Sequence, residues 1–172
     1  MILSAFTIFH VLISLVAIGS GIPVVYGLLT SKRLEGWTLL FLTTTVATSV
    51  TGFFFSIHGF TRGHAVGILS LILLTFSILA RYRFALAGGW RRTYAVTAVT
   101  ALYLNVFVLI VQLFEKVPGL KALAPTQSEA PFKVTQLMAL IAFAALAILA
   151  AIKFQVESPR ARWLAHTASS QW

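Results

Sequence analysis

The sequence predicts an all-α integral membrane protein, a bundle of about five transmembrane helices. Of its 172 residues, 59% are hydrophobic and only 10% are charged, and the mean hydropathy is +0.93. A soluble domain usually carries about 25% charged residues, so this composition cannot build a water-exposed surface. Five long apolar stretches alternate with short polar or charged connections. We therefore expect residues 1–172 to form a single transmembrane helical domain.

The five apolar stretches define the expected spans. They cover residues 3–29, 37–58, 64–80, 94–114 and 132–152, and a short cytoplasmic tail follows at 153–172. Hydrocarbon offers the backbone no water to bond, so a span of about 20 apolar residues must be a helix. A β-barrel would need alternating segments of about ten residues, which the sequence lacks. No basic region precedes the first stretch, so we expect it to remain as a span rather than to be cleaved as a signal peptide.

The basic residues predict the orientation of the bundle. If the helices alternate in direction, one side collects nine Lys and Arg residues: Lys32, Arg33, Arg81, Arg83, Arg91, Arg92, Lys153, Arg160 and Arg162. The other side collects Arg62, Lys116, Lys121 and Lys133. Cytoplasmic loops are the richer in Lys and Arg, so the N-terminus is expected outside and the C-terminus in the cytoplasm. The aromatic, basic stretch 82–93 is then interpreted as a headgroup anchor on the cytoplasmic side.

Composition also excludes several functions. The chain has no cysteine, which rules out disulfides, cysteine-ligated zinc and iron–sulfur clusters. Its net charge of +9 does not indicate nucleic-acid binding, because the basic residues form short clusters between apolar runs rather than one basic face. The four carboxylates lie at helix ends or in loops, so no acid–base pair for hydrolysis is evident. The expected partners are the lipid bilayer and either another membrane protein or a second copy.

Three histidines are the most specific feature of the sequence. His10 lies roughly 12 Å along the first helix, at about 1.5 Å per residue, while His58 ends the second span and His64 begins the third. All three fall on the same, outer side. Neutral imidazoles bind zinc, copper and iron, and two histidines on different helices can hold a haem. We expect His10 and His64 to bind haem b, or His10, His58 and His64 to bind a transition metal.

Two other interpretations of the histidines stay open. A histidine beside Glu115 would relay protons. Alternatively, His58 and His64 cap their helices and His10 donates a hydrogen bond between helices. No HxxxH or HExxH spacing on one helix selects the metal site.

Amide side chains extend the outer polar region. Asn105 and Gln112 are seven residues apart and share a helix face, Glu115 follows at the helix end, and Gln136 enters the fifth span at the same level. We predict a polar pocket from these four residues. The longest loop, 115–133, is either a lid over it or a plain interfacial loop. The threonines of the second span either pack against neighbouring helices or line a path.

Three stretches carry a resemblance: HVLISLVAIGSG at 10–21, ALYLNVFVLIVQLFEKVPGL at 101–120 and LAPTQSEAPF at 123–132. They resemble a family of small, uncharacterised polytopic inner-membrane proteins of bacteria. The resemblance implies a bacterial inner (cytoplasmic) membrane location and brings no activity with it. The placement of histidines near one face is also similar, by analogy alone, to small b-type cytochromes.

Three functions follow from these features. The first is membrane redox chemistry with a haem or metal on the outer histidines. The second is a non-enzymatic accessory or assembly subunit of a membrane complex. The third is a small-solute carrier or channel lined by Asn105, Gln112 and the threonine-rich second helix.

Overall fold

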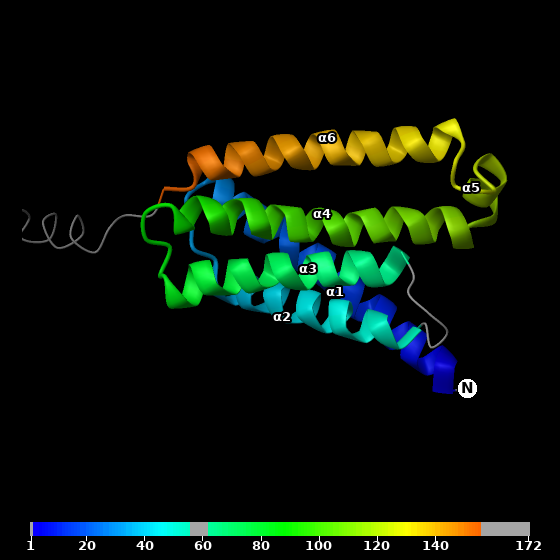
Figure 1. Ribbon diagram of the computed structural model, residues 1–172, viewed down its shortest axis with the longest axis horizontal. Coiled ribbons are helices and arrows are strands. Elements are labelled where there is room, and N and C mark those ends of the chain that lie inside the picture. Colours follow the sequence, from blue (N-terminus) through cyan, green and yellow to red (C-terminus); the bar gives the residue numbers. More distant parts are fainter. Residues whose placement is uncertain (1, 56–61, 156–172) are drawn as a thin grey trace, which may run out of the picture.

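Long helices follow the apolar stretches of the sequence, and a short helix lies in the longest loop (Figure 1). This computed structural model describes residues 2–55 and 62–155. Its long helices are α1 (Ile2–Leu29), α2 (Glu35–Gly52), α3 (Arg62–Ile78), α4 (Trp90–Lys116) and α6 (Ala130–Lys153). The shorter elements are the 3₁₀ turn η1 (Phe53–Phe55), the π-helical segment η2 (Leu79–Arg83) and α5 (Pro118–Leu123).

The predicted all-α fold is confirmed for the described residues. Five of the helices that they form are long and apolar enough to cross a membrane. Several helices extend beyond the predicted spans. The second begins at Glu35, the third continues to Arg83 and the fourth begins at Trp90, because charged and aromatic side chains at a helix end are compatible with the membrane interface. Residues 56–58 and the predicted tail from 156 onward lie outside the described residues.

Helix α4 is the central element of the bundle. It packs against α3 on one side and α6 on the other, and it also contacts α1, whose main partner is α2. Its buried face is lined by small residues, including Ala95, Ala98 and Ala101. Small residues let helix backbones approach closely, so α4 can contact several neighbours at once.

The connections at one end of the bundle are fastened together by hydrogen bonds. The Ser31 hydroxyl donates to the Lys153 carbonyl at 2.8 Å and accepts from the Gln155 N–H at 2.9 Å. Nearby, Arg33 donates to the Ala85 carbonyl at 3.3 Å. The α1–α2 loop, the α3–α4 loop and the end of α6 are therefore held side by side.

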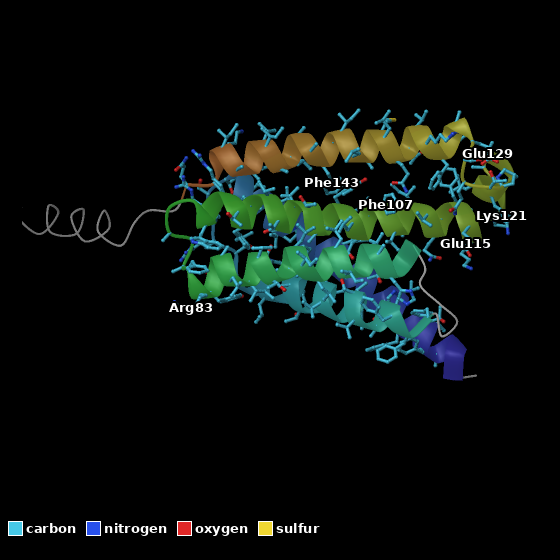
Figure 2. All side chains as sticks on the ribbon, viewed as in Figure 1. Arg83, Phe107, Glu115, Lys121, Glu129 and Phe143 are labelled. Carbon is cyan, nitrogen blue, oxygen red and sulfur yellow. The ribbon has the colours of Figure 1, made fainter. Side chains whose placement is uncertain are left out.

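We call this region the basic end, because it carries six basic residues, each at least partly exposed: Lys32, Arg33, Arg83, Arg91, Arg92 and Lys153. Figure 2 shows Arg83 here and Glu115, Lys121 and Glu129 at the opposite end. The predicted gathering of basic residues on one side is thus seen within the described chain. Which side faces the cytoplasm remains a prediction.

Helix α1 ends in a tight turn that requires a glycine. Ser31 has a positive φ of 57°, and the Lys32 N–H donates back to the Gly27 carbonyl at 2.8 Å, which is a Schellman-type end. A Cβ on Gly27 would lie 2.7 Å from the Lys32 carbonyl oxygen, whereas a Cβ on Gly19 in the same helix would meet nothing within 4 Å. Of these two glycines, only Gly27 has no room for a Cβ atom.

Gly27→Ala is therefore expected to lower the free energy of unfolding by about 1–3 kcal/mol, because the backbone must shift to admit the methyl group. The matched Gly19→Ala variant should be unchanged or up to about 1 kcal/mol more stable, since alanine favours the helix. Thermal unfolding of both variants in detergent measures the difference. Equal melting temperatures would contradict the described end of α1.

Candidate functional site

The His10 ring is fixed against the C-terminal end of α2. Its Nδ1 lies 2.7 Å from the Thr51 hydroxyl oxygen, and that hydroxyl itself donates to the Ala47 carbonyl at 2.7 Å. A hydroxyl has one hydrogen, so Thr51 accepts from His10 when it donates to Ala47. The ring also stands edge-on to Phe55, with centroids 4.8 Å apart.

His64 contacts the same end of α2 on another face. Its ring stacks on Phe53 with centroids 5.4 Å apart, and its Nε2 lies 3.5 Å from the Phe53 carbonyl oxygen. Thr51 and Phe55 are four residues apart and share one face, while Phe53 lies midway between them and faces nearly the opposite direction. The two histidines therefore contact different faces of the turn formed by the end of α2 and η1.

Haem binding by His10 and His64 stays a prediction. Two axial imidazoles must reach one iron from either side of the porphyrin, and here the two rings contact different residues, Thr51 and Phe53. Among the described residues, no group of three or more His, Cys, Asp or Glu side chains is placed to hold a metal ion. The predicted third ligand, His58, lies outside those residues, so the three-histidine metal site stays a prediction.

The predicted pocket residues bond to different neighbours rather than to one another. Asn105 donates to the Thr45 hydroxyl on α2 at 3.3 Å. Gln136 donates to the Phe107 carbonyl at 3.2 Å, between α4 and α6, where Figure 2 labels Phe107 and Phe143.

The other two pocket residues face outward. Gln112 is exposed. Glu115 accepts from the adjacent Lys116 at 2.7 Å, and both side chains are largely exposed. Gln112 and Glu115 therefore lie on the surface of α4, apart from the bonds that Asn105 and Gln136 make between helices.

The loop beside these residues is closed on itself. The Glu129 carboxylate accepts from the Thr126 hydroxyl at 2.8 Å and from the Ser128 N–H at 3.0 Å. Desolvation alone would raise the pKa of Glu129, but these hydrogen bonds outweigh it and lower the pKa below its ordinary value. Gln127 donates to the Val111 carbonyl at 3.0 Å, so the loop is fastened to α4.

One charged group lies in the interior of the described chain. The sequence predicts Arg81 at the surface with the other basic residues of its side, whereas only 4% of its side chain is exposed. It belongs to the buried stripe of α3, after Ser70, Leu74 and Ser77. The spacings of four, three and four residues place all of them on one helix face. That spacing was the signal in the sequence, and it becomes clear only if the third helix continues past residue 80.

Arg81 is held by an ion pair and two aromatic rings. Its Nη2 donates to the Glu35 carboxylate at 2.6 Å, and 64% of the Glu35 side chain is exposed. The guanidinium carbon lies 5.2 Å from the centre of the Tyr94 ring and 6.0 Å from that of Tyr82. Its Nε is buried and has no hydrogen-bond partner in the described chain. On the edge of the guanidinium formed by Nε and Nη2, therefore, only Nη2 has a hydrogen-bond acceptor in the described chain.

An irregular backbone presents this side chain to the interior. Arg81 sits within η2, a π-helical segment that ends with the Phe84 N–H donating to the Leu79 carbonyl at 2.9 Å. The next residues, Ala85 and Leu86, have φ of 48° and 60°, a conformation that costs non-glycine residues free energy. π-helical turns and strained residues are frequent at functional sites. This arrangement makes Arg81 the candidate site.

Hydroxyl groups continue from Arg81 into the bundle. The Tyr94 hydroxyl donates to Thr38 at 3.4 Å, and Ser77 and Thr97 share a hydrogen bond of 2.7 Å between α3 and α4. Deeper in the bundle, Ser49 donates to Ser70 at 3.0 Å.

Comparisons of the chain with protein-family models, with curated proteins and with solved structures gave no match. The site is therefore interpreted from its own geometry.

The two ion pairs of the described chain offer a matched test of this site. Glu35→Gln leaves the buried Arg81 charge without its counter-ion and should lower the free energy of unfolding by about 1–3 kcal/mol, less than for a fully buried pair because Glu35 is exposed. Glu115→Gln removes an exposed pair and should change stability by less than about 0.5 kcal/mol. Thermal unfolding in detergent compares them, and equal effects would show that Arg81 does not depend on Glu35.

Proposed function

We propose that this protein is a small-solute carrier or channel of the bacterial inner membrane, with its basic end in the cytoplasm. The five long apolar helices support a multi-pass membrane protein. The excess of Lys and Arg at the basic end supports the orientation, since such residues are retained on the cytoplasmic side.

One observation carries the proposal: the buried charge of Arg81. Hydroxyl and small residues suffice to pack helices closely, whereas burying a guanidinium carries a large desolvation cost. Ionisable residues inside a membrane bundle are rare, and they often mark the path of a substrate or an ion. A solute pathway gives Arg81 a role that packing does not require.

A polar column on α2 supports a path that begins at Arg81. Thr38, Thr45 and Ser49 are buried along one face of α2. Each bonds to another helix: Thr38 to Tyr94 and Thr45 to Asn105, both on α4, and Ser49 to Ser70 on α3. Of the residues expected to line a path, Asn105 and Thr45 belong to this column, and Gln112 does not.

An apolar layer interrupts the column between Thr38 and Thr45. It contains Phe41, Leu42 and Leu74, which are 0%, 3% and 1% exposed. Hydrophobic constrictions close water-filled paths in channels and transporters. We interpret this arrangement as a closed state, in which a solute reaches Arg81 from the basic end and passes the layer only when helices move.

Proteoliposomes with the full chain would test this function. Efflux of acetate, phosphate, rubidium and glycerol should exceed that from protein-free liposomes for at least one solute. Arg81→Gln should slow that efflux at least about tenfold, because a charge-assisted hydrogen bond is worth about 1.5–3 kcal/mol. Arg83→Gln is the matched control, since this arginine of the same segment is exposed, and it should leave efflux near the wild-type rate.

Other results would favour the competing functions. Efflux equal to that of empty liposomes for every probe would overturn the carrier. A stoichiometric membrane protein that co-purifies with the chain would then favour an accessory subunit. A Soret band that disappears in His10→Ala and His64→Ala would favour the redox function.

A further inference from the structure

The Arg81 guanidinium presents a fork of two donors, of which one is used. In arginine, Nε–H and one Nη2–H point to the same side, and this pair matches two oxygens of a carboxylate or phosphate. In the described chain Nη2 bonds to Glu35 Oε2 at 2.6 Å, and the buried Nε bonds to no group. A buried donor without a partner is costly, so the fork favours any anion that engages both nitrogens.

We propose that Arg81 binds a small anion bearing a carboxylate or phosphate group, and that Glu35 takes the place of this anion in the unliganded protein. The inference rests on the proposed carrier function for its biological role. It names the class of solute and the group within the chain that competes with it.

Glu35 is placed to leave the fork at low cost. It occupies the first turn of α2, and 64% of its side chain is exposed, so its carboxylate can return to water without a large rearrangement. No side chain caps the start of α2, and unpaired N–H groups there favour a negative charge. An anion that displaces Glu35 therefore enters an environment already suited to a carboxylate.

Two aromatic rings lie beside the guanidinium. Tyr94 and Tyr82 lie 5.2 Å and 6.0 Å from the guanidinium carbon, within the range of cation–π contacts. The edge with Nε and Nη2 is the one that carries the unpartnered buried donor. In-plane, two-point binding favours carboxylate and phosphate over a spherical halide.

The surrounding charge favours anions as well. The basic end carries Lys32, Arg33, Arg83, Arg91, Arg92 and Lys153, and Arg91 has a second buried Nε without a partner in the described chain. Like-signed charge around an entrance raises the local concentration of the opposite ion. The phosphate could belong either to a free solute or to a lipid headgroup, because the chemistry at Arg81 is the same.

Binding is tested with the full chain in a neutral detergent, without a membrane. Sodium phosphate or sodium acetate, at constant ionic strength against sodium chloride, should raise the melting temperature and bind measurably by calorimetry. Glu35→Gln should bind the same anion at least about tenfold more tightly, because the competing carboxylate is gone. Arg81→Gln should abolish binding, and Lys121→Gln, which changes an exposed residue at the opposite end of the bundle, should bind as the wild type does.

Two conservative variants keep the test decisive if Glu35→Gln or Arg81→Gln fails to fold. Arg81→Lys keeps the charge and removes the fork, so the preference for acetate over chloride should disappear. Glu35→Asp shortens the competing side chain and should give an affinity between those of the wild type and Glu35→Gln. Binding unaffected by any change at Arg81, or no binding of either anion or lipid, would overturn the proposal.

A comparison of two lipids in the same binding experiment identifies the source of the anion. Phosphatidic acid is compared with diacylglycerol of the same acyl chains, which lacks only the phosphate. Stabilisation by phosphatidic acid that requires Arg81 and blocks acetate binding assigns the site to a headgroup, and stabilisation by soluble anions alone assigns it to a free solute.

These measurements separate this proposal from the carrier function. Anion binding without efflux would support the anion site at Arg81 and contradict the carrier function. Efflux of glycerol or rubidium without any anion binding would support the carrier function and contradict the anion site.

Discussion

The charge on Arg81 is the constraint on which the basic end of the bundle depends. An arginine remains charged at any ordinary pH, and here its side chain lies among apolar helices. Glu35 supplies the counter-charge from α2, Tyr94 makes a cation–π contact from α4, and Arg81 itself belongs to the π-helical segment that follows α3. Three helices thus meet at one group. Loops tied by Ser31 and Arg33 close the same end.

Away from Arg81, the interior is joined by neutral hydrogen bonds, each between two helices. Thr45 with Asn105, Ser49 with Ser70 and Ser77 with Thr97 are of this kind. Such bonds fix which faces meet, and each contributes modestly. The histidine pair follows the same pattern, since His10 contacts the end of α2 and His64 contacts the adjoining η1. Arg81 differs from these neutral contacts because it carries a charge and its Nε–H has no hydrogen-bond acceptor in the described chain.

Hydrophobic patterning predicts the fold well and the interior poorly. Five apolar runs are enough to predict five helices, since a run of about 20 apolar residues permits little else. The amide and histidine positions are also predictable, but their partners are not, because contacts between helices depend on rotation and register. Arg81 was assigned to the rim because arginines that follow an apolar run usually lie there. The π-helical turn, which extends α3 and presents Arg81 inward, has no sequence signature of its own.

The Arg81 Nε–H itself offers the most direct test of the central claim that this fork binds an anion. In protein labelled with ¹⁵N-arginine, the Arg81 resonance is assigned by its absence in Arg81→Lys. Saturating phosphate or acetate should shift this resonance as its N–H gains an acceptor, and chloride at the same ionic strength should not. If the Arg81 resonance is unchanged while those of the exposed arginines shift, the anion binds at the rim and the account is contradicted.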